Sequence, residues 1–278
     1  MEVDLHIHTR YSDGTYSPKE IIEVAHEKQM KVIAITDHDT IDGVLLGAQF
    51  AKEYSIEFIN GIEISCNQDG KDVHILGYFL NLEDEFFKKE INYLQGERER
   101  RNYKIIEKLK KYNIVIEMEE IEKIAKGNIV GRPHFANYLI GRGYARDMME
   151  AFSKYLGRGG LVYVERENFS PQRAVELIRK NGGLSSLAHP KLITENDVYL
   201  IKLIKDLKDR GLGALECNYS SFTKIEAKKY RRMARKHSLL ITGGSDFHGH
   251  NRAGIVVGCA GLEYESFLEL KSQYQKYL

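Results

Sequence analysis

The sequence predicts an α/β protein with a largely parallel sheet, closed or nearly closed into a barrel, and an inserted helical subdomain. Two observations predict the barrel. Short apolar runs alternate with helical patterns on both sides of a helix-rich middle segment. Histidines and carboxylates then follow the apolar runs at their carboxyl ends, where a barrel carries its active site. We therefore expect residues 1–83 and 167–278 to form the barrel, and residues 84–166 to form a helical lid over its active site.

The first expected strand, residues 3–9, alternates polar and apolar residues, which is the period of a strand with one face turned inward. Asp4, His6 and His8 therefore share one face. Two imidazoles placed two residues apart on a strand can bind one metal ion. Asp13 follows on the next loop. Such a cluster is costly to bury without a positive charge, so it indicates a metal site.

A helix is expected to start at Ser17 and end near Met30. Ser17 suits the N-cap, Pro18 suits the first helical position and Glu20 completes a capping box. The continuous apolar run at residues 31–36 is typical of a strand covered on both faces. It ends in Asp37-His38-Asp39, and a second helix is expected at about residues 42–54.

A β-hairpin is expected next. Residues 58–65 form a strand that carries Glu63, and Asn67-Gln68-Asp69-Gly70 is a turn signal. Residues 72–79 then return antiparallel. This hairpin should bring His74 back toward Glu63.

The middle segment is predicted to be helical until Leu161–Val164, whose alternation is that of a strand. Residues 98–111 contain a basic run that can attract a polynucleotide. Such a run is more often a solvated helix surface, which is the interpretation we favour. Gly157-Arg158-Gly159-Gly160 can bring Arg158 near a phosphate, although it lacks the Lys-Ser/Thr of a P-loop and such tetrapeptides are usually plain loops.

The alternation of strand and helix resumes at Ser170-Pro171, which starts a helix that ends at residues 181–183. Strands are expected at residues 183–188, 214–218 and 239–242. The first of these ends in His189-Pro190, and the last runs into Ser245-Asp246-Phe247-His248.

Composition limits the possible functions. The chain has 278 residues and a formal net charge of +1, so its overall charge gives no argument for nucleic acid or membrane. Its three cysteines are scattered and predict reduced thiols rather than disulfides. The N-terminus enters a strand without a signal segment, and we expect a cytoplasmic protein with no membrane association and no obligate protein partner.

Six of the ten histidines are expected at one rim of the barrel, because the carboxyl ends of parallel strands meet there. A single histidine near a strand end is more often a structural group, but the set together predicts a metal centre. His26, His237 and His250 lie in a helix, a helix end and a loop, and are not assigned to it. The expected rim residues are His6, His8, Asp13, His38, Glu63, His74, His189, Asp246 and His248.

The chain resembles the PHP (polymerase and histidinol phosphatase) family of metal-dependent phosphoesterases. Four motifs carry the resemblance in the family's order: Asp4-Leu5-His6-Ile7-His8, Thr36-Asp37-His38-Asp39, His189-Pro190 and Ser245-Asp246-Phe247-His248. Segments around Glu63, His74 and Gly131-Arg132-Pro133-His134 are similar to those of a stand-alone subgroup. That subgroup includes nucleoside 3′,5′-bisphosphate phosphatases and 5′-to-3′ exonucleases on short RNA. The resemblance implies a distorted (β/α)7 barrel.

The resemblance also implies two or three divalent ions, with Mn²⁺, Fe²⁺ or Zn²⁺ favoured because every ligand is N or O. One ion would use His6, His8, Glu63 and Asp246, and a second would share Glu63 and add His74 and His189. A third would use Asp13, His38 and His248, where the family often has His at the position of Asp13. Asp37 and Asp39 are expected to orient ligands. Asp4 is expected either to do the same or to be a solvated carboxylate at the strand start.

The expected reaction is attack of metal-activated hydroxide on the phosphorus of a small nucleotide such as a nucleoside 3′,5′-bisphosphate. Arg132 is expected to grip the phosphate, and His134 to grip it or protonate the leaving group. The alternative for this pair is a helix cap and a structural histidine. Alternative functions are a 5′-to-3′ exonuclease on short RNA, amide-bond hydrolysis, or a non-catalytic metal-binding interaction module.

Overall fold

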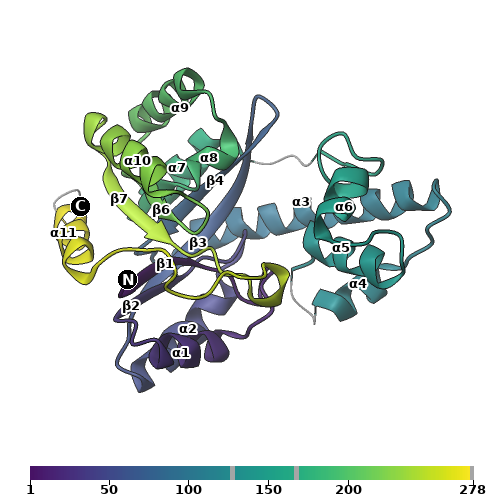
Figure 1. Cartoon of the computed structure of the whole chain (residues 1–278), viewed down its shortest axis with the longest axis horizontal. Helices are drawn as coiled ribbons and strands as arrows, with labels where there is room; N and C mark the ends of the chain where they lie inside the picture. Colours follow the sequence, from purple (N-terminus) through teal and green to yellow (C-terminus); the bar gives the residue numbers. More distant parts are fainter. Residues whose placement is uncertain (126–128, 166–168, 276–278) are drawn as a thin grey trace.

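The computed structural model describes residues 1–125, 129–165 and 169–275. Its centre is a mixed sheet of seven strands in the order β1 to β7, surrounded by helices (Figure 1). The strands are β1 (Val3–Ile7), β2 (Val32–Ile35), β3 (Glu57–Gln68), β4 (Lys71–Tyr78), β5 (Leu184–Leu187), β6 (Ala214–Tyr219) and β7 (Leu240–Gly244). Neighbouring strands are parallel except that β4 is antiparallel to both β3 and β5.

The sheet nearly closes because the chain after β7 returns beside β1. The amide of Asp246 donates to the carbonyl of His6 at 2.7 Å, and the amide of His8 donates to the carbonyl of Phe247 at 2.9 Å. A Cβ atom on Gly244 would lie 2.3 Å from the Cβ of His6, so the close approach of these segments requires glycine. The predicted α/β barrel is confirmed.

Helices cover the outside of the barrel. They are α1 (Pro18–Glu27), α2 (Asp42–Glu53), α7 (Pro171–Lys180), α8 (Pro190–Ile193), α9 (Asp197–Asp209), α10 (Lys224–Lys236) and α11 (Tyr264–Tyr274). In Figure 1, α1 and α2 lie together on one side, and α9 and α10 lie on another. Every residue of β2 is buried, as expected for a strand covered on both faces.

The middle segment is helical and has an apolar core of its own. It contains α3 (Glu85–Lys110), α4 (Met118–Ala125), α5 (Arg132–Gly141), α6 (Met148–Ala151) and a π-helical turn, η1 (Phe152–Leu156). Its core includes Ile116, Phe135 and Leu139. Figure 1 shows α4, α5 and α6 beside the outer part of the long α3, away from β6 and β7.

The expected strand at Leu161–Val164 is wrong. These residues form a turn and irregular backbone. The amides of Leu161 and Val162 donate to the carbonyls of Lys154 and Tyr155, both at 3.0 Å, and Val162 packs into the helical core. Tertiary packing against η1 therefore overrides a short local alternation.

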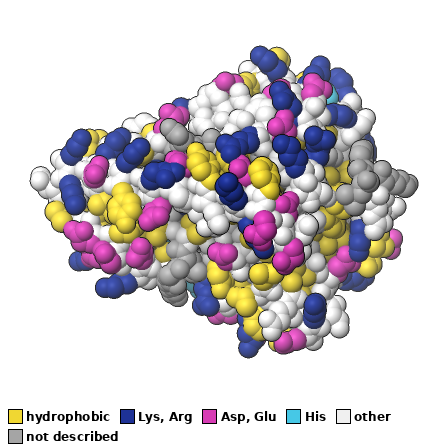
Figure 2. Space-filling model, turned by 180° about the vertical axis from the view of Figure 1, so that it is seen from behind, with side chains coloured by type: hydrophobic (Ala, Val, Ile, Leu, Met, Phe, Trp, Pro, Cys, Tyr) yellow, Lys and Arg dark blue, Asp and Glu magenta, His cyan; other side chains and the backbone are white. Residues whose placement is uncertain are grey.

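The surface carries charges of both signs. On the face shown in Figure 2, Lys and Arg are interspersed with Asp and Glu, in keeping with the net charge of +1. Across the described ranges, no helix has both the length and the apolar composition that crossing a bilayer requires.

The start of α1 provides a test of the predicted capping box. The hydroxyl of Ser17 accepts from the amide of Glu20 at 3.2 Å, and the Glu20 carboxylate accepts from the amide of Ser17 at 2.7 Å. We expect Ser17→Ala to lower the free energy of unfolding by about 1 kcal/mol, because a helix N–H loses its acceptor. Urea unfolding measures this loss. The control Ser272→Ala, exposed near the end of α11, should not show it, and equal losses would contradict the role of the cap.

Candidate active site

The structure brings all nine predicted rim residues together at the carboxyl ends of the parallel strands. His6 and His8 come from β1 and its end, and Glu63 and His74 from the β3–β4 hairpin. The others lie on the loops that follow β1, β2, β5 and β7: Asp13, His38, His189, Asp246 and His248. Most of these side chains are buried, and the most exposed is His74 at 21%.

Glu63 lies at the centre of this group. Its Oε2 is 3.4 Å from His6 Nε2, 3.1 Å from His8 Nε2 and 3.0 Å from His38 Nδ1. Its Oε1 is 2.8 Å from His74 Nδ1 and 3.0 Å from His189 Nε2. One carboxylate therefore contacts five imidazoles, and its two oxygens face different sets of nitrogens.

The hairpin places His74 correctly. Ser65 pairs with His74 in the antiparallel register, and Gln68 pairs with Lys71. Only Asp69 and Gly70 connect the two strands, and both have positive φ, at 52° and 71°. This pattern is that of a two-residue type I′ turn. The predicted hairpin and its effect on His74 are confirmed.

The group around His6, His8, Glu63 and Asp246 has the spacing of a metal site. Asp246 Oδ1 is 3.3 Å from His6 Nε2 and 3.1 Å from His8 Nε2, and the two nitrogens are 3.1 Å apart. Four donors placed tetrahedrally about 2.1 Å from an ion are separated by about 3.4 Å. The observed separations among these atoms, 3.1 to 3.4 Å, are close to that value.

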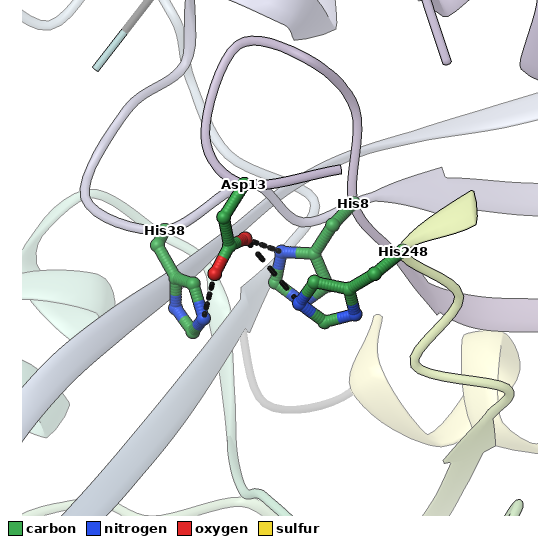
Figure 3. A group of neighbouring side chains, drawn as sticks. All are labelled: His8, Asp13, His38 and His248. Atoms are coloured by element: carbon green, nitrogen blue, oxygen red, sulfur yellow. Dashed lines mark ion pairs between the residues drawn. The ribbon is translucent and has the colours of Figure 1, made fainter. Parts of the chain in front are cut away.

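A second group of donors surrounds Asp13 (Figure 3). Asp13 Oδ1 is 3.3 Å from His248 Nε2 and 3.8 Å from His8 Nδ1, and Oδ2 is 3.8 Å from His38 Nε2. Three imidazoles from different segments thus converge on one carboxylate. Two of these three distances, both 3.8 Å, are longer than any in the first group, so this group is the more loosely held.

Several buried donor atoms at the rim lack hydrogen bonds to the described residues. His38 Nδ1, His189 Nδ1 and Asp246 Oδ1 have none, although His38 Nδ1 lies 3.0 Å from Glu63 Oε2. Asp246 Oδ1 faces the first group. A cation beside Glu63 would satisfy His38 Nδ1 and Asp246 Oδ1, and buried polar atoms are otherwise almost always paired. His189 faces Glu63 through Nε2, so its Nδ1 is not part of this argument. The donor set, imidazole nitrogen and carboxylate oxygen, suits divalent metal ions.

The electrostatics favour positive charge at this centre. Burial by itself would raise the pKa of Glu63, but the imidazoles around this carboxylate, His74 and His6 among them, hold that pKa well below its usual range. Burial would lower the pKa of His8, yet Asp246 and Glu63 raise it to about 10. Burial lowers the pKa of His38 to about 3, against the opposite effect of Glu63 and Asp13.

The backbone bends sharply where several of these residues leave their strands. Asp39, His189 and Asp246 have φ values of 55°, 26° and 54°, in the left-handed region that residues other than glycine rarely adopt. Such strain costs about 1–3 kcal/mol per residue and is concentrated at functional sites.

Two cavities adjoin the rim. One is lined by Asp13, His38 and His74 together with Arg98, Arg101 and Arg132, and the other by Glu63, His189 and Asp246 together with Arg132 and Arg252. Arg132 therefore borders both, and its guanidinium is 3.2 Å from Asp72. Phe152, at the start of η1, also borders both.

The other predicted substrate residues are placed differently. His134 is buried, and its Nδ1 accepts from the amide of Gly131 at 2.9 Å, so a neutral His134 carries its proton on Nε2. Arg158 does not line either rim cavity. It is exposed, lies over Gly70 in the hairpin turn and is 3.7 Å from Glu165.

Comparison with known proteins identifies the family. The model of the PHP domain matches residues 4–184. This chain belongs to the PHP domain family. It is 36% identical over 248 residues to a 5′-3′ exoribonuclease of Haemophilus influenzae, covering 88% of this chain and 89% of that protein. It is 30% identical over 264 residues to a 3′,5′-nucleoside bisphosphate phosphatase of Chromobacterium violaceum, covering 92% of this chain and 90% of that protein.

A solved structure has the same fold throughout. It is described as an amidohydrolase from C. violaceum with bound sulfate and no metal. It superposes with a TM-score of 0.89 at 28% identity and covers 98% of this chain and 96% of its own. The PHP family and these relatives confirm the predicted class of enzyme, a metal-dependent phosphoesterase.

Carboxylates behind the PHP rim fix its loops. Asp37 accepts from Thr9 Oγ1 and Ser12 Oγ, both at 2.6 Å, so it holds the loop that carries Asp13 rather than a ligand directly. Asp4 is fully buried and accepts from the amides of Ser245 and Gly258 at 2.9 and 2.8 Å, so the expectation of a solvated carboxylate is wrong. Burial raises the pKa of Asp4 to about 6.

Sequence reasoning missed Glu216, a buried carboxylate in the middle of β6. Its Oε1 is 2.9 Å from His6 Nδ1, and its Oε2 accepts from the amide of His189 at 2.7 Å. It therefore orients the imidazole of His6 and the backbone of His189. An acidic residue inside an apolar strand was the available signal, because a buried carboxylate needs polar partners.

The interpretation of the basic run as a solvated helix surface is wrong at its start. Arg98 and Arg101 are buried. Arg98 Nη2 is 2.5 Å from Asp39 Oδ2, so α3 is fixed to the loop after β2. The same ion pair shows one role of Asp39, which is to fix α3 to the barrel.

Proposed function

We propose that the protein hydrolyses the phosphomonoester of a small nucleotide such as a nucleoside 3′,5′-bisphosphate, with two or three divalent ions at the rim. The convergence of five imidazoles on Glu63, with Asp246 Oδ1 facing the same space, carries the proposal. The bisphosphate phosphatase relative, similar over 92% of this chain, supports the choice of substrate. We also propose that residues 84–166 act as the lid.

The proposed ligand sets follow the groups at the rim. His6, His8, Glu63 and Asp246 would hold one ion, and Glu63, His74 and His189 a second. Asp13, His38 and His248 would hold a third. Imidazole and carboxylate donors without thiolate favour Mn²⁺, Fe²⁺ or Zn²⁺.

The chain's own residues bind and orient the substrate. When bound, the ions lower the pKa of a water molecule and neutralise charge on the phosphoryl group. Arg132, at the border of both cavities, offers a planar fork that matches two phosphate oxygens. A neutral His134 would carry its proton at Nε2 and would donate it from there to the oxygen of the leaving group. Its side chain is buried and lines neither cavity, so this step requires the substrate to reach it.

Removal of metal tests the proposal. We expect protein treated with EDTA to release no phosphate from nucleoside 3′,5′-bisphosphate, and added Mn²⁺ to restore release, because the imidazoles and carboxylates described at the rim do not replace the ions. The same assay with Mg²⁺ or Ca²⁺ is the control for metal preference. Failure to release phosphate from any phosphomonoester or RNA oligonucleotide would instead favour a non-catalytic metal-binding module.

The second candidate is a 5′-to-3′ exonuclease on short RNA. The position of Arg158 favours it, because this exposed cation lies over the hairpin turn at Gly70 and outside the rim cavities, where a longer substrate would extend. Products from 5′-phosphorylated RNA of increasing length, resolved by gel, distinguish the two candidates.

Paired substitutions sharpen this distinction. We expect Arg132→Gln to raise KM for a nucleoside bisphosphate about tenfold or more, because a charge-assisted hydrogen bond to phosphate is lost. Arg158→Gln should leave that KM unchanged and raise only the KM for an oligonucleotide. Equal effects of both variants on the mononucleotide would contradict the placement of Arg132 at the phosphate.

A further inference from the structure

Arg252 is a cation of the rim to which the proposed function gives no role. It follows a short 3-10 helix, η2 (Gly249–Asn251), and lines the same cavity as Glu63, His189 and Arg132. Its side chain is 30% exposed. It is therefore at the mouth of the site, where a substrate enters.

The guanidinium of Arg252 is held in place from one side. Nη1 donates to the Asp246 carboxylate through Oδ2 and to the Asp246 carbonyl at 3.3 Å. Nη2 donates to the hydroxyl of Tyr219 at 2.7 Å, and this hydroxyl donates to Asp246 Oδ2 at 2.7 Å. Arg252 and Tyr219 thus occupy Oδ2, while Oδ1 faces the imidazoles of His6 and His8.

Arg252 keeps donors for another ligand. An arginine has five N–H groups, and the described residues accept three hydrogen bonds from Arg252. The Nε proton and one Nη2 proton remain. A guanidinium with two remaining donors beside a metal site is suited to an oxyanion such as phosphate.

The loop that carries Arg252 is anchored. The side chain of Asn251 donates to the carbonyl of Asp13 at 2.7 Å and accepts from Asn137 of α5 at 3.1 Å. The amide of His250 donates to Thr15 Oγ1 at 3.0 Å. Because the loop is fixed to both the barrel and the helical segment, little conformational entropy is lost when Arg252 binds a ligand.

We infer that Arg252 binds the phosphoryl group that is hydrolysed, across the cavity from Arg132, and that Tyr219 is a positioning residue for it. Asp72, which holds Arg132, is on β4, and Asp246, which holds Arg252, follows β7, so the two carboxylates are three strands apart in a sheet of seven. This inference rests on the proposed function. It adds a second cation that reaches the phosphate from the opposite wall.

Two kinds of measurement separate this role from support of Asp246 alone. The variants are Arg252→Gln, Arg252→Lys and Tyr219→Phe, with Arg142→Gln on the exposed end of α5 as the control. Calorimetry measures the binding of inorganic phosphate to Mn²⁺-saturated protein and of sulfate to metal-free protein. Metal analysis and Mn²⁺ titration measure the site itself, and steady-state kinetics gives KM and kcat.

With Mn²⁺ saturating, we expect Arg252→Gln to weaken phosphate binding and raise KM about tenfold. The phosphate affinity of Arg252→Lys should lie between those of Arg252→Gln and the unaltered protein, since lysine keeps the charge without the planar fork of donors. Tyr219→Phe should weaken phosphate binding less than Arg252→Gln does. Arg142→Gln should change neither phosphate binding nor KM.

The inference is overturned if Mn²⁺-saturated Arg252→Gln binds phosphate as tightly as the unaltered protein and loses only Mn²⁺ affinity, because Arg252 would then act solely through Asp246. Anion binding is measured without turnover. A protein inactive on every substrate would thus refute the proposed function while leaving the role of Arg252 to the calorimetric result.

Discussion

Replacing Glu63 with glutamine is expected to lower kcat for phosphate release about a thousandfold or more, at the upper end of what loss of one electrostatic group costs an active site. The amide keeps the shape of the side chain but removes the charge that faces five imidazoles. One of its two carboxylate oxygens also becomes an NH₂ group, which cannot accept a hydrogen bond or bind a metal ion. The metal content of the purified variant should fall together with kcat.

A matched substitution tests whether this effect belongs to the rim itself. Glu216→Gln makes the same chemical change at a carboxylate that contacts His6 from behind. We expect a loss of about 10–100-fold, typical of residues that orient a metal ligand. Elemental analysis and kinetics on both variants show which substitution causes the larger loss of metal and of kcat. A larger loss at Glu216 than at Glu63 would contradict the central place of Glu63.

Replacing Arg98 with methionine is expected to destabilise the protein by about 3–5 kcal/mol, because a buried carboxylate loses its closest cation. Asp39 is fully buried, and Arg98 Nη2 is 2.5 Å from its Oδ2. Arg98 also connects α3 to β3, since its Nη2 is 3.4 Å from Ser65 Oγ. Urea unfolding of metal-free protein measures the change without a contribution from bound ions.

The double variant Arg98→Met/Asp39→Asn provides the control. With the buried negative charge also removed, we expect a loss smaller than that of Arg98→Met alone, because no uncompensated charge remains. The introduced carboxamide would still offer an oxygen to the backbone amide of Ser65, which donates to Asp39 Oδ1 at 2.9 Å. Additive losses would indicate that the ion pair contributes little.

The elements that sequence predicted well are specified by neighbours along the chain. The alternation around His6 and His8, the capping box at Ser17 and the two-residue turn at Asp69-Gly70 each depend on a few adjacent residues. The rim could be assembled from these elements because parallel strands end on the same side of a barrel.

The residues that sequence reasoning missed depend on distant partners. Arg98 pairs with a residue 59 positions away, and Glu216 with one 210 positions away. The basic run around Arg98 was interpreted as a solvated surface because the sequence does not show which buried carboxylate lies beside it in the fold. Arg252 lies in a polar loop whose position depends on contacts with Asp13 and Asn137, and no local pattern predicts those contacts.

The brevity of the Asp69-Gly70 connection limits how this hairpin can change in length. Side chains alternate between the two faces of a strand, so a one-residue slip in β4 would turn the imidazole of His74 away from Glu63. A single-residue insertion or deletion within β4, between the turn and His74, would shift this register and turn one donor away from the centre. Natural variants should therefore keep the number of residues between the turn and His74, which comparison of homologous genes can check.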